Sequence, residues 1–236
     1  MIKFNKQILD KATELNGIDE YVLMCSSGVD SIAGVHYLLS KAKKRDRFRF
    51  KVFHFNHKIR PQNDKMEESF YNFMNTELPN FYKTVITRST YIGKLSAHTE
   101  AELRDFRLDK LRQYVHKNVI VSFHHLNDCV ESYLLNCIRG HDSYQPIPFW
   151  TEWNQDTSNV SCHPFLFTKK QDFIDYCVKH DLMKYVVEDE TNTVSKGSRR
   201  NMIRNEIIPI LQRDKVGLET IVSKKMQKRL MVDLLK

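Results

Sequence analysis

Residues 23–31, with the sequence LMCSSGVDS, decide the fold. Apolar residues run directly into small ones, and a helical pattern opens near Asp30 and Ser31. Small side chains let backbone N–H groups approach an anion closely, and the positive end of the helix dipole points at the same place. The stretch predicts a strand, a phosphate-binding turn and a helix, although an ordinary strand-to-helix connection would use the same residues. It is not a Walker loop, because no lysine follows at the required place.

Composition places the chain among folded, basic proteins. Its 236 residues, 41% of them hydrophobic, are enough for one α/β domain with a small appendage. A net charge of +8 favours a polyanionic partner. The five cysteines form no Cys-x-x-Cys pair, which disfavours disulfides and cysteine-only metal sites. No apolar run is long enough to span a bilayer and no signal-peptide pattern is present, so we expect a cytoplasmic protein without a membrane partner.

Strand-like and helix-like segments alternate along the first two thirds of the chain. Short apolar strands are expected at residues 21–24, 50–55, 81–86 and 119–123. Helical spacing of apolar residues occurs at 5–16, 31–39, 64–73 and 100–116. This alternation predicts an α/β fold with a doubly wound, mainly parallel five-stranded sheet. Further helices are expected at 169–180, 198–212 and 218–235, and a proline-containing loop at 140–160.

Polar residues follow two of these strands, and doubly wound sheets bind ligands beyond the carboxyl ends of their strands. Residues 54–60 (HFNHKIR) follow the second strand and are suited to line the base and ribose of a nucleotide. Residues 125–132 (HLNDCVES) follow the fourth, with Asp128 and Glu131 three residues apart at a helix start. These carboxylates are suited to Mg²⁺ or to the ammonium group of a small substrate. The ordinary alternatives are a hydrophilic loop and an acidic first turn that stabilises the helix dipole.

Two further segments carry arginines. Glu100, Arg104 and Arg107 share one side of the expected helix, where a surface ion pair is the ordinary explanation. The functional explanation is that Arg104 neutralises phosphate charge in a transition state. Residues 198–205 (SRRNMIRN) follow an acidic run at 188–192, and charge patterning leaves a capped, solvated helix and a binding segment equally open.

Taken together, these segments resemble the catalytic domain of the tRNA(Ile)-lysidine synthetases, a family of PP-loop ATP pyrophosphatases. Seven motifs occur in that family's order between residues 20 and 212. They lie at residues 26–31, 54–60, 100–107, 125–132 with 139–140, 163–166, 188–192 and 200–204. The chain departs from the pattern at Ser27, Asn127, Cys129 and His163, where the family has glycine, an acid, commonly glutamine, and arginine. Loss of the acid at position 127 is expected to weaken metal or lysine binding.

The resemblance implies an enzyme that uses ATP and Mg²⁺ to adenylate the wobble cytidine of tRNA(Ile), with a CAU anticodon, and then joins free lysine to it. The implied catalytic residues are Arg104, His125, Asp128 and Glu131, with Asp30 and Asp128 as metal ligands. The implied ATP-binding residues are Ser26, Ser27, Gly28, Val29, Asp30, Ser31, His54, Asn56 and His57. The implied RNA-binding residues are Arg60, Arg139, Arg200, Asn201 and Arg204.

The resemblance also implies a division of the chain. Residues 1–165 would form the PP-loop, ATP-binding catalytic domain, and residues 166–236 a helical part that contacts tRNA; a homodimer is compatible with it. Two alternatives stay open. One is a tRNA sulfur-transfer enzyme, which the lack of a Cys-x-x-Cys pair disfavours. The other is a diverged PP-loop protein that binds tRNA without catalysis, for which Ser27 and Asn127 are the reasons.

Overall fold

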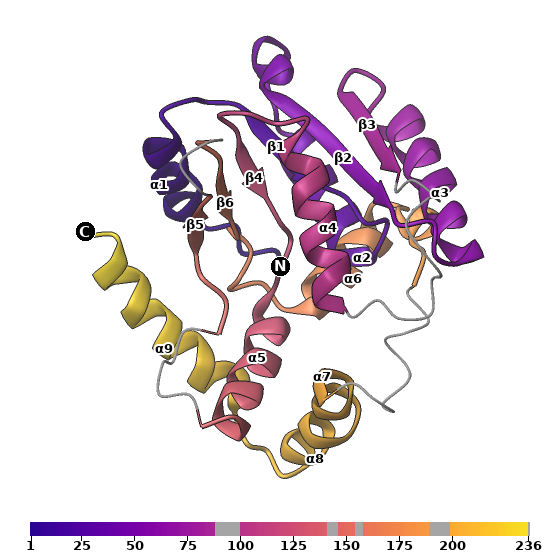
Figure 1. Ribbon diagram of the computed structural model, residues 1–236. Helices are drawn as coiled ribbons and strands as arrows, with labels where there is room; N and C mark the ends of the chain where they lie inside the picture. The colour runs from indigo at the N-terminus through magenta and orange to yellow at the C-terminus, as the bar shows by residue number, and fades with distance from the viewer. Residues whose placement is uncertain (88–99, 141–145, 154–157, 189–198, 236) are drawn as a thin grey trace.

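A six-stranded sheet forms the centre of the computed structural model, which describes residues 1–87, 100–140, 146–153, 158–188 and 199–235 (Figure 1). The strands are β1 (Tyr21–Met24), β2 (Phe50–Asn56), β3 (Tyr82–Thr87), β4 (Val119–Val121), β5 (Trp150–Glu152) and β6 (Val160–Cys162). They lie in the order β3-β2-β1-β4-β6-β5, and every neighbouring pair is parallel except β5 and β6. The predicted doubly wound, mainly parallel α/β fold is confirmed.

The sheet has six strands where five were predicted. The additional pairing involves β5, which lies inside the segment expected to be a loop, and β6, which begins at its end. Each of these strands has three residues. β4 is equally short, but its three residues are all apolar, whereas β5 and β6 contain polar residues and are too short to show an alternating pattern.

Helices flank the sheet and continue beyond it. They are α1 (Lys6–Asn16), α2 (Val29–Leu39), α3 (Pro61–Glu77), α4 (Glu100–Arg112), α5 (Leu126–Ile138), α6 (Lys170–Lys179), α7 (Arg199–Met202), α8 (Ile208–Arg213) and α9 (Leu218–Asp233). The helix expected at 198–212 is interrupted by a π-helical turn, Ile203–Ile207. Pro209 lies two residues after the end of this turn. Proline has no N–H to donate and crowds the preceding turn, which explains the irregular hydrogen bonding there.

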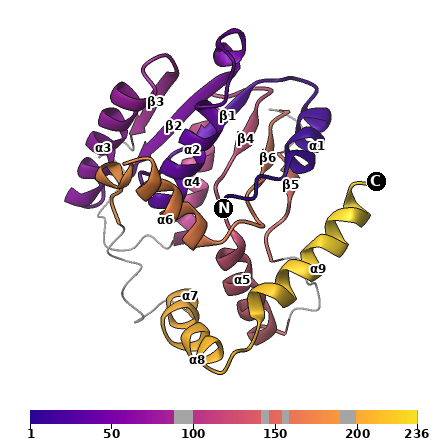
Figure 2. The same cartoon turned by 180° about the vertical axis from the view of Figure 1, so that it is seen from behind.

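Each face of the sheet has its own hydrophobic core. Val22 and Ile120 belong to the smaller core, together with Leu111 of α4. Their strand neighbours Leu23 and Val121 belong to the main core with α1, α2, α3 and α6. Successive residues of a strand point to opposite faces, which produces this division. Figures 1 and 2 show α4 in front of one face and α2 with α6 in front of the other.

Helix α2 is pressed closely against the end of β4. A Cβ atom on Gly34 would lie 2.0 Å from the ring of Phe123, far below any tolerated contact. Glycine is therefore required where the two elements cross. This close approach brings the first turn of α2 next to the residues that follow β4.

The C-terminal part shares the main core with the sheet. Phe173 and Cys177 of α6 and Met226 of α9 belong to the same cluster as the residues of α2. The division of the chain at residue 165 thus remains a prediction. Among the described residues, no helix is long and apolar enough to cross a membrane.

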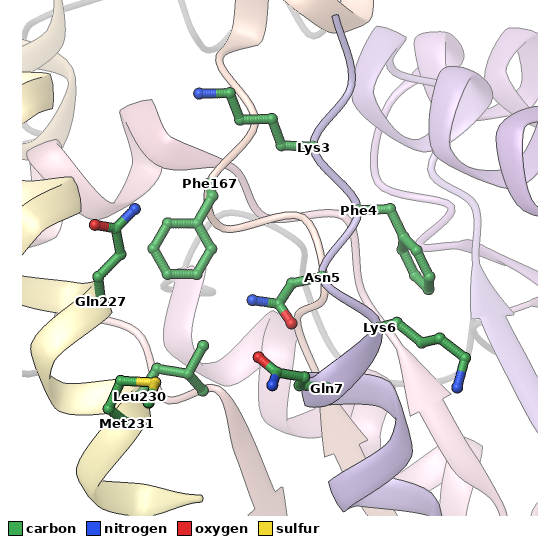
Figure 3. Close-up of a pocket in the computed structure, with 9 residues that line it drawn as sticks. All are labelled: Lys3, Phe4, Asn5, Lys6, Gln7, Phe167, Gln227, Leu230 and Met231. Carbon is green, nitrogen blue, oxygen red and sulfur yellow. The ribbon is translucent and has the colours of Figure 1, made fainter.

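Helix α9 crosses the body of the protein over a hollow of about 540 Å³ (Figure 3). The hollow lies between residues 3–7 and Gln227, Leu230 and Met231 of α9, with Phe167 at its wall. None of the predicted site residues lines it. The second half of α9 therefore borders this hollow on one side, while Met226 and Leu230 pack into the main core.

Candidate active site

Two helices begin at the point where the strand order reverses. β1 pairs with β2 on one side and with β4 on the other, so the carboxyl ends of β1 and β4 border the crevice where doubly wound sheets bind ligands. Helix α2 follows β1 with Gly28 as its N-cap, and α5 follows β4 with His125 as its N-cap. The predicted loop and the predicted His125 segment are thereby neighbours.

The loop after β1 is closed by its own hydroxyl groups. Ser31 Oγ donates to the carbonyl of Gly28 at 2.9 Å and accepts the N–H of Ser26 at 3.1 Å. Gly28 has no side chain, and no side-chain hydrogen bond caps α2. The first N–H groups of a helix have no intrahelical acceptor, and together they favour a negative charge. The start of α2 is therefore a suitable place for phosphate oxygens.

Ser27 shows why this position favours glycine. Its φ is +63°, a left-handed conformation that costs a residue with a side chain about 1–2 kcal/mol. The side chain is buried, and its Oγ donates to the carbonyl of Met66 in α3 at 2.7 Å. A hydrogen bond of this kind contributes roughly 1 kcal/mol, which offsets much of the strain. Ser27 thus attaches the loop to α3, a contact that glycine could not make.

An imidazole joins the two helix starts. His125 Nε2 lies 3.4 Å from Asp30 Oδ2, and His125 Nδ1 lies 3.4 Å from Asp128 Oδ2. Within α5, Nδ1 accepts the N–H of Asp128 at 3.2 Å, while Asp128 Oδ2 accepts the N–H of His125 at 3.0 Å. A neutral ring with its proton on Nε2 satisfies both sides, donating toward Asp30. We call these three residues the Asp–His–Asp relay.

The relay changes the acidity of its members. Burial works to lower the pKa of His125, but the carboxylates of Asp128 and Asp30 outweigh it and the pKa is raised. Burial works to raise the pKa of Asp128, but the nearby imidazoles of His125 and His124 hold it below its usual value. His125 is therefore suited to accept a proton near neutral pH.

Asp30 has an unused oxygen. Its Oδ1 is buried and has no hydrogen-bond partner among the described residues. Carboxylate oxygens are preferred Mg²⁺ ligands, and Mg²⁺ is commonly held by one or two carboxylates together with substrate phosphates. In the described part of the chain, no group of three or more His, Cys, Asp or Glu side chains is arranged to hold a metal. A magnesium ion fits Asp30 only if the nucleotide supplies further oxygens.

Glu131 is occupied by arginines. It is 3% exposed, and Arg204 binds it through Nε at 2.6 Å and through the second guanidinium nitrogen at 2.8 Å. Arg200 Nε donates to the same carboxylate at 3.1 Å, and Arg200 also donates to Ser132 Oγ at 2.9 Å. Hydrogen bonding to Glu131 raises the pKa of Arg204 further. The predicted catalytic glutamate thus holds two predicted RNA-binding arginines beside α5, and Asn201 lies between them in sequence.

Of the predicted nucleotide-binding residues at the end of β2, His54 contacts the loop, and Asn56 and His57 contact their own neighbours. His54 is buried, and its Nδ1 is 2.9 Å from the carbonyl of Cys25. Asn56 accepts the N–H of Lys58 at 2.8 Å and donates to Asp64 at 3.0 Å. His57 packs edge-on against Phe55, and Arg60 is the N-cap of α3.

Two predicted site residues lie apart from the relay. The side chain of Arg104 is 64% exposed and pairs with Asp105 at 3.3 Å. Arg139 is the C-cap of α5 and is exposed; a helix of this length places it roughly 20 Å from His125. The segment at 188–192, apart from Glu188, lies outside the described residues, as does Ser198, the expected start of the late helix.

Arg107 is the arginine of α4 that comes near the relay. Burial lowers the pKa of His124, and the charges of Arg200, His125 and Arg107 lower it further, although Asp128 opposes them. The sequence contains a signal for this difference. Arg107 lies in the same helical stripe as Leu103 and Leu111, which points toward the sheet, whereas Arg104 lies beside that stripe.

His163 also comes to the site, in place of the arginine expected from the resemblance. It follows β6, and its Nδ1 lies 3.3 Å from Nδ1 of His124. Burial and the neighbouring His124 lower the pKa of His163 well below its usual value. The pair is neutral at pH 7, so this position lacks the positive charge an arginine would bring.

Comparison with known proteins places the chain in a family. A family profile described as the PP-loop domain matches residues 2–211. The tRNA(Ile)-lysidine synthase of the Aster yellows witches'-broom phytoplasma is 28% identical over 215 residues, covering 89% of this chain and 45% of that protein. The protein of the same name from Lactiplantibacillus plantarum is 30% identical over 212 residues, with the same two coverages. The tRNA(Ile)-lysidine synthase of Wigglesworthia glossinidia brevipalpis is 27% identical, and this chain covers 58% of that protein.

The chain spans about half the length of these relatives. Among solved structures, the U34-tRNA thiolase NcsA from Methanococcus maripaludis, with its 4Fe-4S cluster, superposes with a TM-score of 0.64 at 12% identity. The superposition covers 96% of this chain and 79% of the thiolase, and it shows the fold alone. The resemblance to the tRNA(Ile)-lysidine synthetases is confirmed by the sequence relatives. Because the profile match spans most of its residues, the chain belongs to the PP-loop domain family.

Proposed function

We propose that this chain adenylates the wobble cytidine of a tRNA(Ile) with a CAU anticodon and joins free lysine to it. The observation that carries the proposal is the meeting of an uncapped helix start with the Asp–His–Asp relay at the reversal of strand order. The similarity to lysidine synthases over nearly nine tenths of the chain supports this choice of reaction.

In the proposed site, residues 26–31 bind the phosphates of ATP through backbone N–H groups of the loop and of α2. Asp30 and Asp128 are the candidate Mg²⁺ ligands, and the unused oxygen of Asp30 supports its part. A bound Mg²⁺ would neutralise negative charge on the phosphates. His54 holds the end of β2 against the loop, and Asn56 and His57 would lie next to the bound nucleotide.

The proposed reaction has two steps. The cytidine O2 attacks the α-phosphorus of ATP, and the bond to pyrophosphate breaks. The ε-amine of lysine then attacks C2 of the base, and the bond to AMP breaks. Free lysine is mostly protonated near pH 7, so a base must take its proton first. His125, with its raised pKa and its position between two carboxylates, is our candidate for that base. Its Nδ1 would take the proton by giving up the Asp128 N–H that it accepts.

Positive side chains around the relay are the proposed contacts for phosphate groups and tRNA. Arg107 extends from α4 toward His124, and Arg60 begins α3. Arg104, which lies apart from the relay and pairs with Asp105, would reach the activated phosphate only by leaving that pair. Arg200, Asn201 and Arg204 come from the C-terminal part. We propose that Glu131 acts by holding Arg200 and Arg204 in place. Arg139, at the far end of α5, would contact a more distant part of the tRNA, as would the rest of the helical part.

Sulfur transfer is less well supported than ligation. It needs a reactive thiolate, and Cys25 of the loop is buried, which raises its pKa to about 11. Burial also raises the pKa of Cys129. A protein that binds tRNA without catalysis has no need of an Asp–His–Asp relay beside an open helix start. Ligation accounts for both features.

The test is ATP-dependent incorporation of labelled lysine into a tRNA(Ile) transcript. Asp30→Ala should reduce incorporation about 100-fold or more, because it removes a candidate ligand of the Mg²⁺ that would neutralise charge on the reacting phosphates. Asp10→Ala, at an exposed position of α1 that pairs with Lys6, is the matched control and should keep full activity. Tight tRNA binding without incorporation in the unaltered protein would reject ligation in favour of non-catalytic binding.

A further inference from the structure

Asn127 does not face the nucleotide side of the site. Its Oδ1 accepts the N–H of Lys170 at 3.0 Å, and its Nδ2 donates to Glu219 Oε1 at 3.1 Å. Lys170 begins α6 and Glu219 belongs to the first turn of α9. One amide therefore connects the starts of three helices, α5, α6 and α9.

The chemistry of this contact requires an amide. The second oxygen of Glu219 is bound by Lys169 Nζ at 2.5 Å, and this hydrogen bond raises the pKa of Lys169. An aspartate at position 127 would still accept the N–H of Lys170. It has no N–H to donate, however, and it would set a second carboxylate against Glu219. The acid expected from the resemblance is thus incompatible with the Glu219 contact.

The first turn of α9 is held by polar contacts of Glu219 with Asn127 and Lys169. Val222, Met226 and Leu230 form its buried stripe, and its second half borders the hollow described above (Figure 3). Figures 1 and 2 both show its first half beside α5. Asn127 is also the residue before Asp128, so the attachment is one residue away from the Asp–His–Asp relay.

We propose that Asn127 is a positioning residue that fixes α9 to the site, and not a ligand of metal or lysine. Lys224 and Lys228 lie on the side of α9 opposite the buried stripe, one turn apart and exposed. Held by Asn127 and Glu219, this side presents two positive charges to the phosphate backbone of the tRNA. This second part rests on the proposed function, whereas the attachment of α9 does not.

The experiment compares Asn127→Asp, Glu219→Gln and the double variant N127D/E219Q. Hydrogen exchange of α9 and the affinities for tRNA and for ATP are measured for each. In Asn127→Asp, we expect amide exchange in α9 to speed up about 10-fold and tRNA binding to weaken several-fold, with the Kd for ATP unchanged within about twofold. The double variant should restore both properties, because its new amide at position 219 can donate to its new carboxylate at position 127.

Asn136→Asp is the matched control. It makes the same change on α5 nine residues later, on the opposite side of the helix, and should alter neither measurement. The proposal is overturned if Asn127→Asp leaves exchange in α9 unchanged or tightens the binding of ATP. If the unaltered protein does not bind tRNA, the proposed function fails, but the exchange measurement still decides the role of Asn127.

Discussion

Helices α2 and α5 start side by side at the same edge of the sheet, yet their first turns are arranged differently. Gly28 leaves the start of α2 without a side-chain cap. His125 and Asp128 close the start of α5 with reciprocal hydrogen bonds. The N–H groups of a helix start need an acceptor, from the chain or from a ligand. The difference teaches that α2 is arranged to receive a ligand anion, whereas α5 holds its own acid and base in fixed positions.

The largest effect is expected when the uncapped start of α2 is given a side-chain cap. Gly28→Asp would supply a carboxylate cap to α2; Gly28 has φ −77°, which any residue adopts. Folding should gain only a few tenths of a kcal/mol, because glycine is itself a tolerated N-cap. ATP binding should weaken about 100-fold or more, since juxtaposed like charges cost several kcal/mol.

Calorimetric titration with ATP and a thermal melt measure the two effects together. Gly28→Asn is the control: it caps the helix without a charge and should weaken ATP binding less. Equal losses for the two substitutions would mean that the loop excludes any side chain. The charge argument would then be wrong.

The second effect concerns Glu131, which attaches Arg200 and Arg204 to helix α5. Glu131→Gln removes the charge that faces Arg200 and Arg204. Loss of one member of a buried ion pair costs about 3–5 kcal/mol, but these arginines are about a quarter to a third exposed, so we expect about 2 kcal/mol. Denaturant unfolding measures it. The control is Glu14→Gln, at an exposed position that pairs with Lys11, and it should lower the free energy of unfolding by almost nothing. If both substitutions lower it by a similar amount, Glu131 has no special role in stability.

The third effect is a shift in pH dependence. His125 has a raised pKa, so activity that needs its neutral form should rise with pH through a value above 6.5. Its protonated form correspondingly stabilises the fold below pH 6.5, and this contribution is lost as pH rises through the raised pKa. Asp128→Asn removes a carboxylate that raises this pKa, so the acid limb of the rate profile should move to lower pH. Asp105→Asn, at an exposed position of α4, should leave the limb in place; an unmoved limb in Asp128→Asn would exclude His125 as the base.

The smallest effect is expected at Ser27. Ser27→Gly removes the strain of a positive φ and also the hydrogen bond to Met66, so stability should change by less than about 1 kcal/mol. Ser27→Ala keeps the strain and loses the hydrogen bond, and should be destabilising by about 1 kcal/mol. Chemical denaturation distinguishes them. A glycine variant less stable than the alanine variant would contradict the account of this position.

Local patterns predicted much of the fold. Apolar periodicity indicates the strands β1 and β2 and the helices α1 and α9 to within a few residues. β5 and β6 could not be found in this way, because each has three residues, some of them polar, and shows neither a period nor the continuous apolar run of β4. The late helix was expected to be continuous, although Pro209 could have indicated the irregular turn before it.

The candidate site likewise has residues whose place the local sequence predicts and residues whose partners it does not. The loop and His125 with Asp128 follow strands directly, so their sequence position predicts their place at the sheet edge. The partners of Glu131 and Asn127 lie about 70 and 90 residues further along the chain. No local pattern shows that Glu131 binds Arg204 or that Asn127 meets Glu219. The packing of α9 and of the π-helical turn against α5 brings them together.

Product analysis of ATP turnover tests the central claim most directly. The protein is incubated with ATP labelled at the α-phosphate or the γ-phosphate, together with tRNA(Ile) and lysine, and the products are separated. We predict AMP and pyrophosphate in equal amounts, with one lysine joined to tRNA for each AMP, and no turnover without tRNA. Release of ADP and inorganic phosphate, or no nucleotide turnover in the complete mixture, would contradict an adenylating site at the open start of α2.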